Sequence, residues 1–498
     1  MKLPRSFYNP VSLTGSIIAG ISLLIIIFSL VAMLLFDLGS SYVGLFVYIV
    51  LPVFLIIGLI LIPVGMIRRS RREARMGEDL SRGIIIDLNN RKHRNALMLF
   101  IVVTLVFLFL TGIGSYEAFH YTESNEFCGM LCHKVMKPEY TAYQESAHSR
   151  VACVECHVGQ GADWFVRSKL SGLYQVYSVL AKKYPQPIPA PVENLRPAQE
   201  TCERCHWPNK FYSYRLHNEI HYLADQDNTQ WNIQLKMKTG PDHSSGGLSE
   251  GIHWHINPDI KVEYIASTHD REALPWVRYV NLETGDTLIF QDLNEPLDQQ
   301  ARDTLKMRVM DCIDCHNRPS HHYLPPQEFT DLLIASGDIP GELPEVKYLA
   351  MDLFNSVYES HDTAMKVIET LLPEFYNEYY PDISAENKDM INKAIDGFKM
   401  GFSKNIFPEM KASWDVYPNH LGHVEFNGCV RCHDGTHQTN EGRVISDDCN
   451  LCHTIQAQGP PDSLMVALSN EALEFRHPID IDEVWKEYAC VECHRYLY

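Results

Sequence analysis

The chain has 498 residues, enough for two or three domains, and 46% of them are hydrophobic. Its 62 acidic residues outnumber its 43 basic residues, which gives a formal net charge of −19 at pH 7. A surface of this sign repels nucleic acid, so we expect no nucleic-acid partner.

Three long apolar segments come first, at about 11–35, 42–67 and 96–116. Each is long enough to cross a bilayer as a helix, which needs about 20 mostly apolar residues. The first run is too long for a signal peptide and has no small-x-small cleavage site, so we interpret it as a retained anchor. Residues 1–120 are therefore predicted to form a three-helix membrane anchor in contact with lipid.

The loop 68–94 sets the predicted orientation of this anchor. It holds nine Lys or Arg residues against four acidic residues. Basic loops remain on the cytoplasmic side, so this loop and the N-terminus are predicted to be cytoplasmic. Three crossings then place residue 121 onward in the periplasm of a bacterium, with the anchor in the inner membrane.

All fourteen cysteines lie in seven cysteine–histidine units, which leaves none for a disulfide. Cys-x-x-Cys-His is the attachment pattern of haem c, in which two thiols bind the haem vinyl groups and the adjacent imidazole becomes an axial iron ligand. The first unit has one extra residue between its thiols. The units are Cys128/Cys132/His133, Cys153/Cys156/His157, Cys202/Cys205/His206, Cys312/Cys315/His316, Cys429/Cys432/His433, Cys449/Cys452/His453 and Cys490/Cys493/His494.

Structural zinc is the alternative for such cysteine pairs. Zinc sites usually combine two Cys-x-x-Cys halves and need no histidine directly after the second cysteine. The cysteine pattern therefore favours seven covalently bound haem c groups.

Between these units the sequence predicts three further regions. Residues 162–183 repeat apolar residues on one helical face, which either packs against haem or protein or lies at the membrane surface. Alternating residues between 252 and 291, including Ile252–Ile256, indicate strands of a small β insertion at about 222–300. Helical repeats indicate a helical spacer at 326–413. The predicted fold is thus a mainly α, membrane-anchored chain, with a tetrahaem domain at 121–325 and a trihaem domain at 414–498.

Fifteen histidines remain for the seven distal iron positions once the proximal ones and His93 are set aside. Iron with histidine on both sides favours electron transfer, because no position is open for a substrate. The distal candidates, chosen by their place along the chain, are His148, His217, His221, His253, His255, His321, His322, His420, His423, His437 and His477.

The region from about 96 to 322 resembles the NapC/NirT (NrfH-like) tetrahaem quinol dehydrogenases. The resemblance is carried by Phe127-Cys128, the Cys-His-x-x-Met-x-Pro-Glu-Tyr run at 132–140, Ser-Ala-His at 146–148, and the stretch from Cys312 to His321. The whole chain resembles ImcH-type seven-haem inner-membrane cytochromes.

The resemblance implies specific iron ligands. His148 would bind the haem of His206, His321 the haem of His157, and either His217 or His221 the haem of His316. The first haem would be bound by His133 or by Met136, because the extra residue in that unit leaves both open.

The resemblance also implies that quinol, such as menaquinol, gives electrons to the first haem. In the family a lysine and an acidic residue line the quinol site. Lys169 suits the first role, while Gln175 or Asp163 stands near the second. The expected function is thus oxidation of the quinone pool's quinol and electron relay to a periplasmic cytochrome or reductase.

Two other functions stay open at this point. The chain could be a non-catalytic electron-transfer subunit of a larger membrane complex, or a homo-oligomer of that kind. A haem-based reductase is the third hypothesis, and it needs one open iron position.

Overall fold

The computed structural model describes residues 5–36, 47, 50–75, 88–130, 133–159, 161–191, 196–211, 213–241, 248–468 and 471–495. Cys132, residues 42–46, 48 and 49 of the second apolar segment and residues 76–87 of the basic loop lie outside these ranges. The chain forms two compact units, residues 1–133 and 134–498, which are described separately below.

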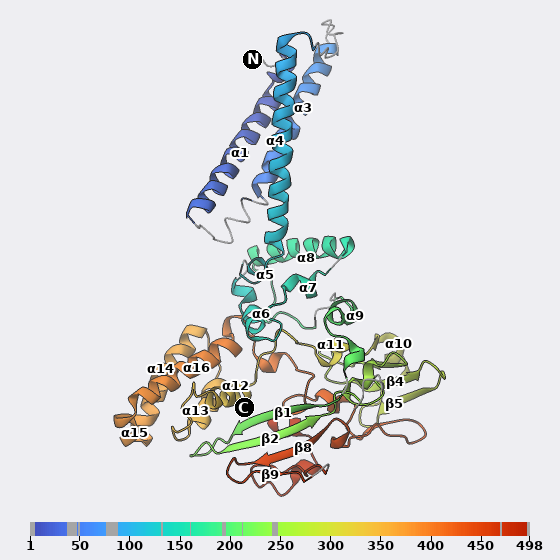
Figure 1. The fold of residues 1–498 in the computed structure, drawn as a ribbon, viewed down its shortest axis with the longest axis vertical. Coiled ribbons are helices and arrows are strands. Elements are labelled where there is room, and N and C mark those ends of the chain that lie inside the picture. The colour runs from blue at the N-terminus through green and yellow to red at the C-terminus, as the bar shows by residue number, and fades with distance from the viewer. Residues whose placement is uncertain are drawn as a thin grey trace. The chain divides into compact units, whose positions relative to one another are not determined.

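The first unit is helical. Its helices are α1 (Pro10–Phe36), α3 (Leu51–Arg75), α4 (Arg91–Thr122) and α5 (Asn125–Met130) (Figure 1). Small residues bring α1 against α3: a Cβ on Gly15 would lie 2.7 Å from the carbonyl oxygen of Gly58, and Ser12 donates a 2.8 Å hydrogen bond to the carbonyl of Ile62. Close approach through small and hydroxyl residues is how helices pack in lipid, where burial of apolar surface gives no driving force.

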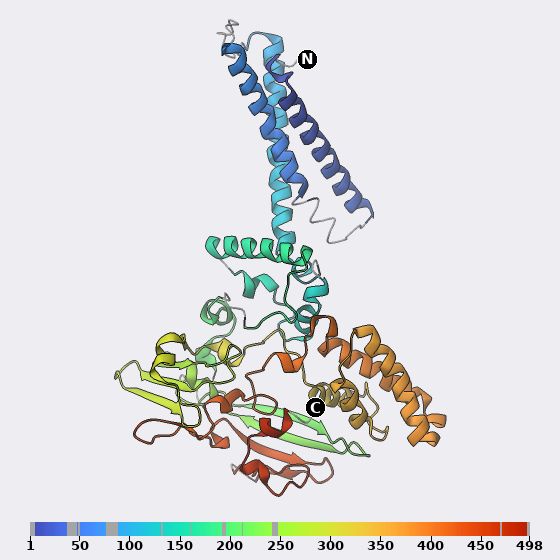
Figure 2. The same ribbon diagram turned by 180° about the vertical axis from the view of Figure 1, so that it is seen from behind.

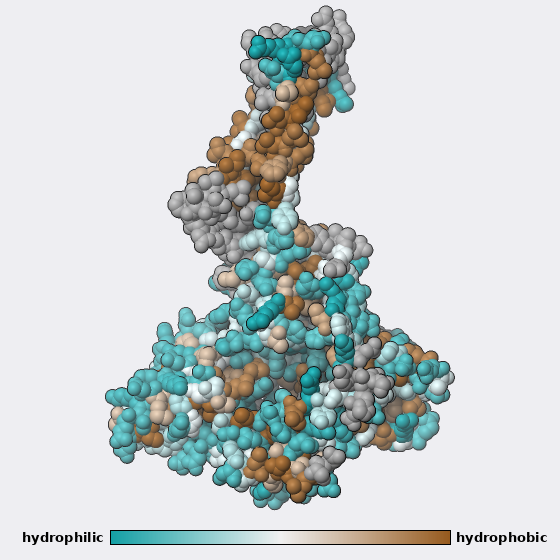
Figure 3. Space-filling view, in the orientation of Figure 1, coloured by the Kyte–Doolittle hydropathy of each residue, from teal (hydrophilic) through white to brown (hydrophobic). Residues whose placement is uncertain are grey.

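Two helical stretches among the described residues, Pro10–Ser29 and Leu51–Arg69, are long and apolar enough to cross a membrane. Only 22% and 17% of their residues are buried, whereas a core helix of a soluble protein hides most of its apolar residues. Figure 3 shows the apolar side chains on the outside of these helices. The two helices therefore suggest a membrane anchor. Helix α3 continues to Arg75, so the first part of the predicted basic loop is helical.

The second unit combines short helices with two antiparallel sheets (Figures 1 and 2). The four-stranded sheet has the order β1-β2-β8-β9, and the five-stranded sheet has the order β6-β3-β4-β5-β7. The strands are β1 (Arg215–Tyr222), β2 (Gln230–Met237), β3 (Ile260–Ile265), β4 (Trp276–Asn281), β5 (Thr287–Asp292), β6 (Met307–Val309), β7 (His437–Gln438), β8 (His453–Gly459) and β9 (Met465–Val466). Both sheets include strands from beyond residue 436, so the β structure extends past the expected insertion at about 222–300.

The stretch Ile252–Ile256, interpreted as a strand, is a 3-10 helix instead. A strand would direct residues 253 and 255 to the same face, because its side chains alternate. A 3-10 helix has three residues per turn, so these two side chains point in different directions. His253 and His255 contact two different histidines, His316 and His433, which the helical conformation allows.

The helices of the second unit fall into two groups. Before the sheets and between their strands lie α6 (His133–Glu145), α7 (Cys153–His157), α8 (Ala162–Leu180), α9 (Ala198–Thr201), α10 (Gln299–Thr304) and α11 (Cys312–Cys315), and α17 (Cys490–His494) closes the chain. The expected helical spacer contains α12 (Pro326–Ala335), α13 (Val346–Asn355), α14 (His361–Tyr379), α15 (Pro381–Glu386) and α16 (Lys388–Asn405). Ile368, Leu372, Phe398 and Phe402 are fully buried there, so this helical region has a protein core of its own.

A buried polar cluster joins this helical region to the β1–β2 hairpin. The carboxylate of Asp331 is 3% exposed and accepts hydrogen bonds from the Lys347 ammonium group and from the Tyr222 amide. His221 lies 3.5 Å from the same carboxylate and 3.1 Å from that of Glu219. Two cations thus balance a carboxylate that water does not reach.

We expect Lys347→Met to lower the free energy of unfolding by about 3 kcal/mol, because it leaves the buried Asp331 carboxylate short of one partner. Chemical unfolding of the full chain, followed by circular dichroism, measures this change. Lys366→Met, at an exposed site on α14, is the matched control and should change stability by less than about 0.5 kcal/mol. Equal effects of the two substitutions would contradict the assignment.

His221 makes stability depend on pH. Burial lowers the pKa of His221, but hydrogen bonds to Asp331 and Glu219 outweigh burial and raise it to about 9. Since this value lies above the ordinary 6.5 or so of an unfolded histidine, the stabilisation is complete below about pH 6.5 and is lost as pH rises through 9. We expect a loss of about 3 kcal/mol across that window. This loss of unfolding free energy between pH 6.5 and 9 should be smaller in His221→Gln and unchanged in His217→Gln.

Candidate functional site

Six of the seven proximal histidines have a second imidazole ring opposite them. The ring centres lie 5.9 to 6.4 Å apart in every case. The pairs are His157/His321 (6.1 Å), His206/His148 (6.0 Å), His316/His253 (6.4 Å), His433/His255 (5.9 Å), His453/His423 (6.1 Å) and His494/His477 (6.2 Å).

This separation fits one metal ion between two imidazoles. A metal about 2 Å from one nitrogen of each ring places the ring centres about 6 Å apart. Rings that touched each other face to face would be much closer. The repetition of one distance in six pairs therefore fits iron bound by histidine on both sides, as in six-coordinate haem.

Hydrogen bonds at the other ring nitrogen support this fit. In six of these rings Nδ1 lies 2.7 to 3.2 Å from a backbone carbonyl oxygen. A carbonyl only accepts hydrogen bonds, so Nδ1 carries the hydrogen and Nε2 keeps the lone pair that binds metal. The six contacts are His148 to Pro319, His253 to Thr239, His255 to Ile252, His321 to Glu139, His433 to Ser446 and His477 to Ile479.

Each Cys-x-x-Cys-His unit folds as a single helical turn. The first cysteine of each of the six units lies in α7, α11, α17 or one of the 3-10 helices Cys202–Arg204, Gly428–Arg431 and Cys449–Leu451. Residues three apart lie on one side of such a turn, which brings the two thiols together. In the unit at 312–316 the amide of His316 donates to the carbonyl of Cys312 at 2.8 Å, which holds the histidine beside the thiols.

One cysteine in five of these units is exposed rather than buried. Cys205 and Cys493 are exposed, and so are Cys156, Cys429 and Cys449. The physical reason is that a one-turn helix directs only part of its circumference toward the rest of the chain. A thioether forms at the edge of the haem and needs no buried thiol, so haem attachment at Cys205 and Cys493 stays a prediction.

The resemblance implied a distal ligand for three of these units, and the structure differs from it at one of the three. The structure brings His148 to His206 and His321 to His157, as the resemblance implied. His316 faces His253 with nearly parallel rings, 9° apart, rather than His217 or His221. Those two histidines lie on β1 and contact Glu219 at 2.9 and 3.1 Å, so their ring nitrogens are engaged by a carboxylate.

Three other distal candidates take part in local polar contacts. His322 contacts the Asn419 amide at 3.0 Å. His420 and His437 are almost fully buried, and both nitrogens of each ring contact oxygen atoms. Burial opposes a charge on His437, but Asp434 raises its pKa. None of these three rings faces a proximal histidine among the described residues, so iron binding by them stays a prediction.

Units that are consecutive in the sequence are also neighbours in space. The thiols of Cys202 and Cys312 lie close enough to shift each other's pKa, which is lowered for Cys202 and raised for Cys312. Burial raises the pKa of Cys315 to about 11, and the thiol of Cys429 adds to this shift. Burial likewise raises the pKa of Cys452 to about 11, with a further contribution from Cys429. The attachment turns from 202 to 452 therefore follow one another in chain order.

The first unit and the expected quinol site are described only in part. Cys132 and the side chains of His133 and Asp163 lie outside the described residues, while Met136 is half-buried on α6. Lys169 is half-buried and Gln175 is exposed, both on α8.

Helix α8 carries a row of uncovered apolar side chains. Leu170, Leu173, Tyr174, Tyr177 and Leu180 are between 52% and 80% exposed. The described chain therefore does not cover this face, as packing against the protein would require.

The chain was compared with known proteins. Residues 90–188 match the NapC/NirT cytochrome c family, N-terminal region. The chain is 40% identical over 491 residues to "Cytochrome c-type protein ImcH" of Geobacter sulfurreducens, which covers 98% of this chain and 95% of that protein. It is 27% identical over 115 residues to "Cytochrome c-type protein NrfH" of Wolinella succinogenes, covering 22% of this chain and 63% of that protein. No solved structure matches.

These relationships agree with the attachment turns and the paired histidines. Cytochromes of this family carry covalently bound haem c, which the six described Cys-x-x-Cys-His units fit. The chain belongs to the NapC/NirT family of c-type cytochromes, in its ImcH-type branch.

Proposed function

We propose that the protein is a membrane-bound cytochrome c with seven haems, which oxidises quinol and relays electrons to a periplasmic acceptor. The six histidine pairs carry this proposal, because two imidazoles at one iron leave no position for a substrate. Bound haem supplies the one-electron chemistry. The chain's own residues hold the ligands, set the spacing of the units and exclude water.

Electrons travel in chain order in this proposal. They enter at the unit 128–133, where His133 or Met136 would hold the iron, and leave at the unit 490–494. The neighbouring thiols of Cys202 and Cys312, and of Cys315 and Cys429, support this order. The excess of acidic residues favours an acceptor with a basic docking surface.

The quinol site lies on α8. The Lys169 ammonium group orients a quinol oxygen, with Asp163 or Gln175 nearby, and the exposed apolar face of the helix rests on lipid. Helix α4 is the third membrane crossing. The N-terminus is then cytoplasmic, and the protons of quinol leave on the periplasmic side.

The full chain in liposomes with a menaquinol analogue tests the function. Prompt reduction of its haems by the analogue is the expected result. Reduction only after a further subunit is added would replace this proposal with the electron-transfer subunit of a larger complex. A large fraction of high-spin ferric haem would instead favour a reductase.

The histidine pairing is tested by His253→Ala. Because this substitution removes the ring opposite His316, one haem in seven should become high-spin in the ferric state. Electron paramagnetic resonance of the oxidised full chain measures that fraction. His217→Ala is the matched control and should leave every haem low-spin; the opposite result would assign His217 as the ligand.

The quinol site is tested by Lys169→Met. Loss of the ammonium group should slow reduction by menaquinol about a hundredfold, as removal of one positioned donor commonly does. Reduction by dithionite should keep its rate, since it does not use the quinol site. Lys182→Met, at an exposed residue beyond α8, is the control. A normal menaquinol rate in Lys169→Met would remove Lys169 from the site.

A further inference from the structure

Two consecutive attachment units carry opposite charges at the same position. Asp314 is the third residue of Cys-Ile-Asp-Cys-His at 312–316, and Arg431 is the third residue of Cys-Val-Arg-Cys-His at 429–433. Asp314 is 1% exposed and Arg431 is 8% exposed. Charged residues are seldom buried in proteins unless they are paired, so both side chains need partners inside the protein.

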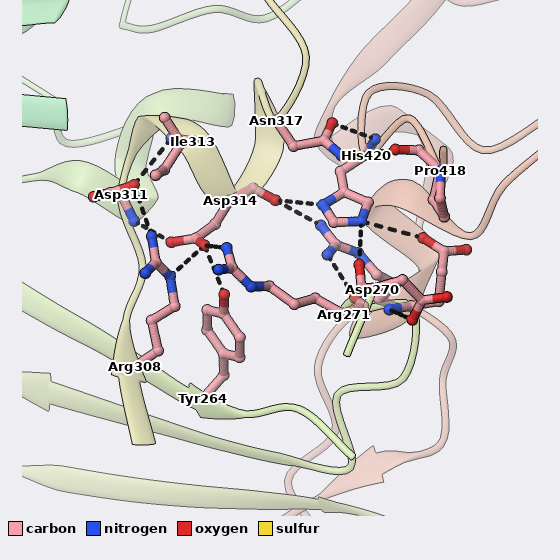
Figure 4. A network of polar contacts seen from close by, with 12 residues as sticks. Tyr264, Asp270, Arg271, Arg308, Asp311, Ile313, Asp314, Asn317, Pro418 and His420 are labelled. Carbon is pink, nitrogen blue, oxygen red and sulfur yellow. Dashed lines mark hydrogen bonds and ion pairs between the residues drawn. The ribbon is translucent and has the colours of Figure 1, made fainter. Parts of the chain in front are cut away.

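The carboxylate of Asp314 is held by four donors (Figure 4). One oxygen accepts from the Tyr264 hydroxyl at 2.6 Å, from Arg308 at 2.6 Å and from Arg271 at 3.0 Å. The other oxygen accepts from the Asp311 amide at 2.8 Å. Tyr264 is on β3 and Arg308 on β6, so these bonds fix the turn 312–316 to the five-stranded sheet.

The guanidinium of Arg431 binds three backbone carbonyl oxygens. It donates to Gly428 at 2.7 Å, to Arg271 at 2.9 Å and to Asp314 at 3.0 Å. The first bond shapes its own turn, and the third crosses to the neighbouring unit. A planar group with five donors in a fixed geometry makes all three at once, which a lysine does not.

His420 makes a second link around the same carbonyl. Its Nδ1 donates to the carbonyl of Asp314 at 3.1 Å, and its amide donates to the Asn317 side chain at 3.0 Å (Figure 4). Its Nε2 lies 3.1 Å from the carbonyl of Asp270 and 3.3 Å from the Glu272 carboxylate. The segment before the unit 429–433 is thus tied to the turn 312–316.

We propose that Arg431 is a positioning residue that sets the spacing between the fourth and fifth attachment units. The inference rests on the proposed electron relay and names a contact that joins its first four units to its last three. Its guanidinium binds the carbonyl of Asp314 inside one attachment unit and the carbonyl of Gly428 directly before the other. The guanidinium therefore lies between the two attachment sites, where it fixes distance and local electrostatic potential together.

Arg431→Met tests this role in the full chain in liposomes. The side chain keeps an unbranched apolar stem but loses the guanidinium group, with its three hydrogen bonds and its charge. After mixing with a menaquinol analogue, four sevenths of the haem absorbance should change at the wild-type rate. The remaining three sevenths should follow about tenfold more slowly, since a small displacement of reacting groups has effects of this order.

A redox titration with dithionite and mediators gives a second readout, which does not depend on quinol oxidation. Loss of a buried cation beside two haems should lower their midpoint potentials in Arg431→Met. Failure of menaquinol to reduce wild-type protein would overturn the proposed function. In that case the titration would still show whether Arg431 changes the midpoint potentials of the fourth and fifth haems.

Three further variants separate positioning from general destabilisation. Arg278→Met removes an ion pair of the same sheet, with buried Glu263, but contacts no attachment unit; it should keep wild-type kinetics and potentials. Arg431→Lys keeps the charge and should restore the potentials more fully than the rate. Tyr264→Phe removes one hydroxyl from Asp314 and should show the slow phase in a weaker form.

Single-phase reduction and unchanged potentials in Arg431→Met with seven haems would overturn the proposal. If this variant assembles fewer haems, the same measurements on Arg431→Lys and Tyr264→Phe decide. A slow three-sevenths phase in either supports the role, and wild-type behaviour in both overturns it.

Discussion

The structure of the second unit depends on one geometric requirement, the distance of about 6 Å between two imidazole rings that share a metal. Six pairs meet it, and in two of them the members are far apart in the sequence: His157 and His321 are separated by 164 positions, and His255 and His433 by 178. Each such pair acts as a crosslink once the iron is bound. The chain must therefore place remote segments to within a fraction of an ångström.

The protein meets this requirement with backbone hydrogen bonds rather than with a large hydrophobic core. Nδ1 of six of the twelve paired rings contacts a carbonyl, which fixes both the tautomer and the direction of the ring. The main apolar core lies in the helices α12 to α16, where no attachment unit occurs. Near the units, buried charges such as Asp314 and Arg431 take the place of apolar packing.

Local chemistry decides how much of this could be predicted from the sequence. The attachment units are visible because both thiols and the proximal histidine lie within five residues, although the pattern does not reveal that Cys205 and Cys493 are exposed. Distal ligands are set by the tertiary fold, and position along the chain does not determine where a ring points. His420 and His437 stand close to an attachment unit in the sequence, but their rings point into polar clusters. Nothing in the sequence indicates the role of Arg431, because any residue can occupy the third position of Cys-x-x-Cys-His.

The partner of His316 illustrates the same limit. The 3-10 helix Ile252–Ile256 directs His253 toward His316, and the alternating pattern of the sequence does not predict that conformation.

The pairing of β2 with β8 also bears on how the protein is made. Residues 232–237 form one ladder with residues 453–459, and β5 pairs with β7 in the other sheet. Neither sheet is complete until nearly the whole chain has left the ribosome. The early units must wait in an unfinished structure meanwhile, so haem attachment has time to precede final folding. Deleting the last fifty residues would remove β8 and β9, two of the four strands of the first sheet, along with two attachment units.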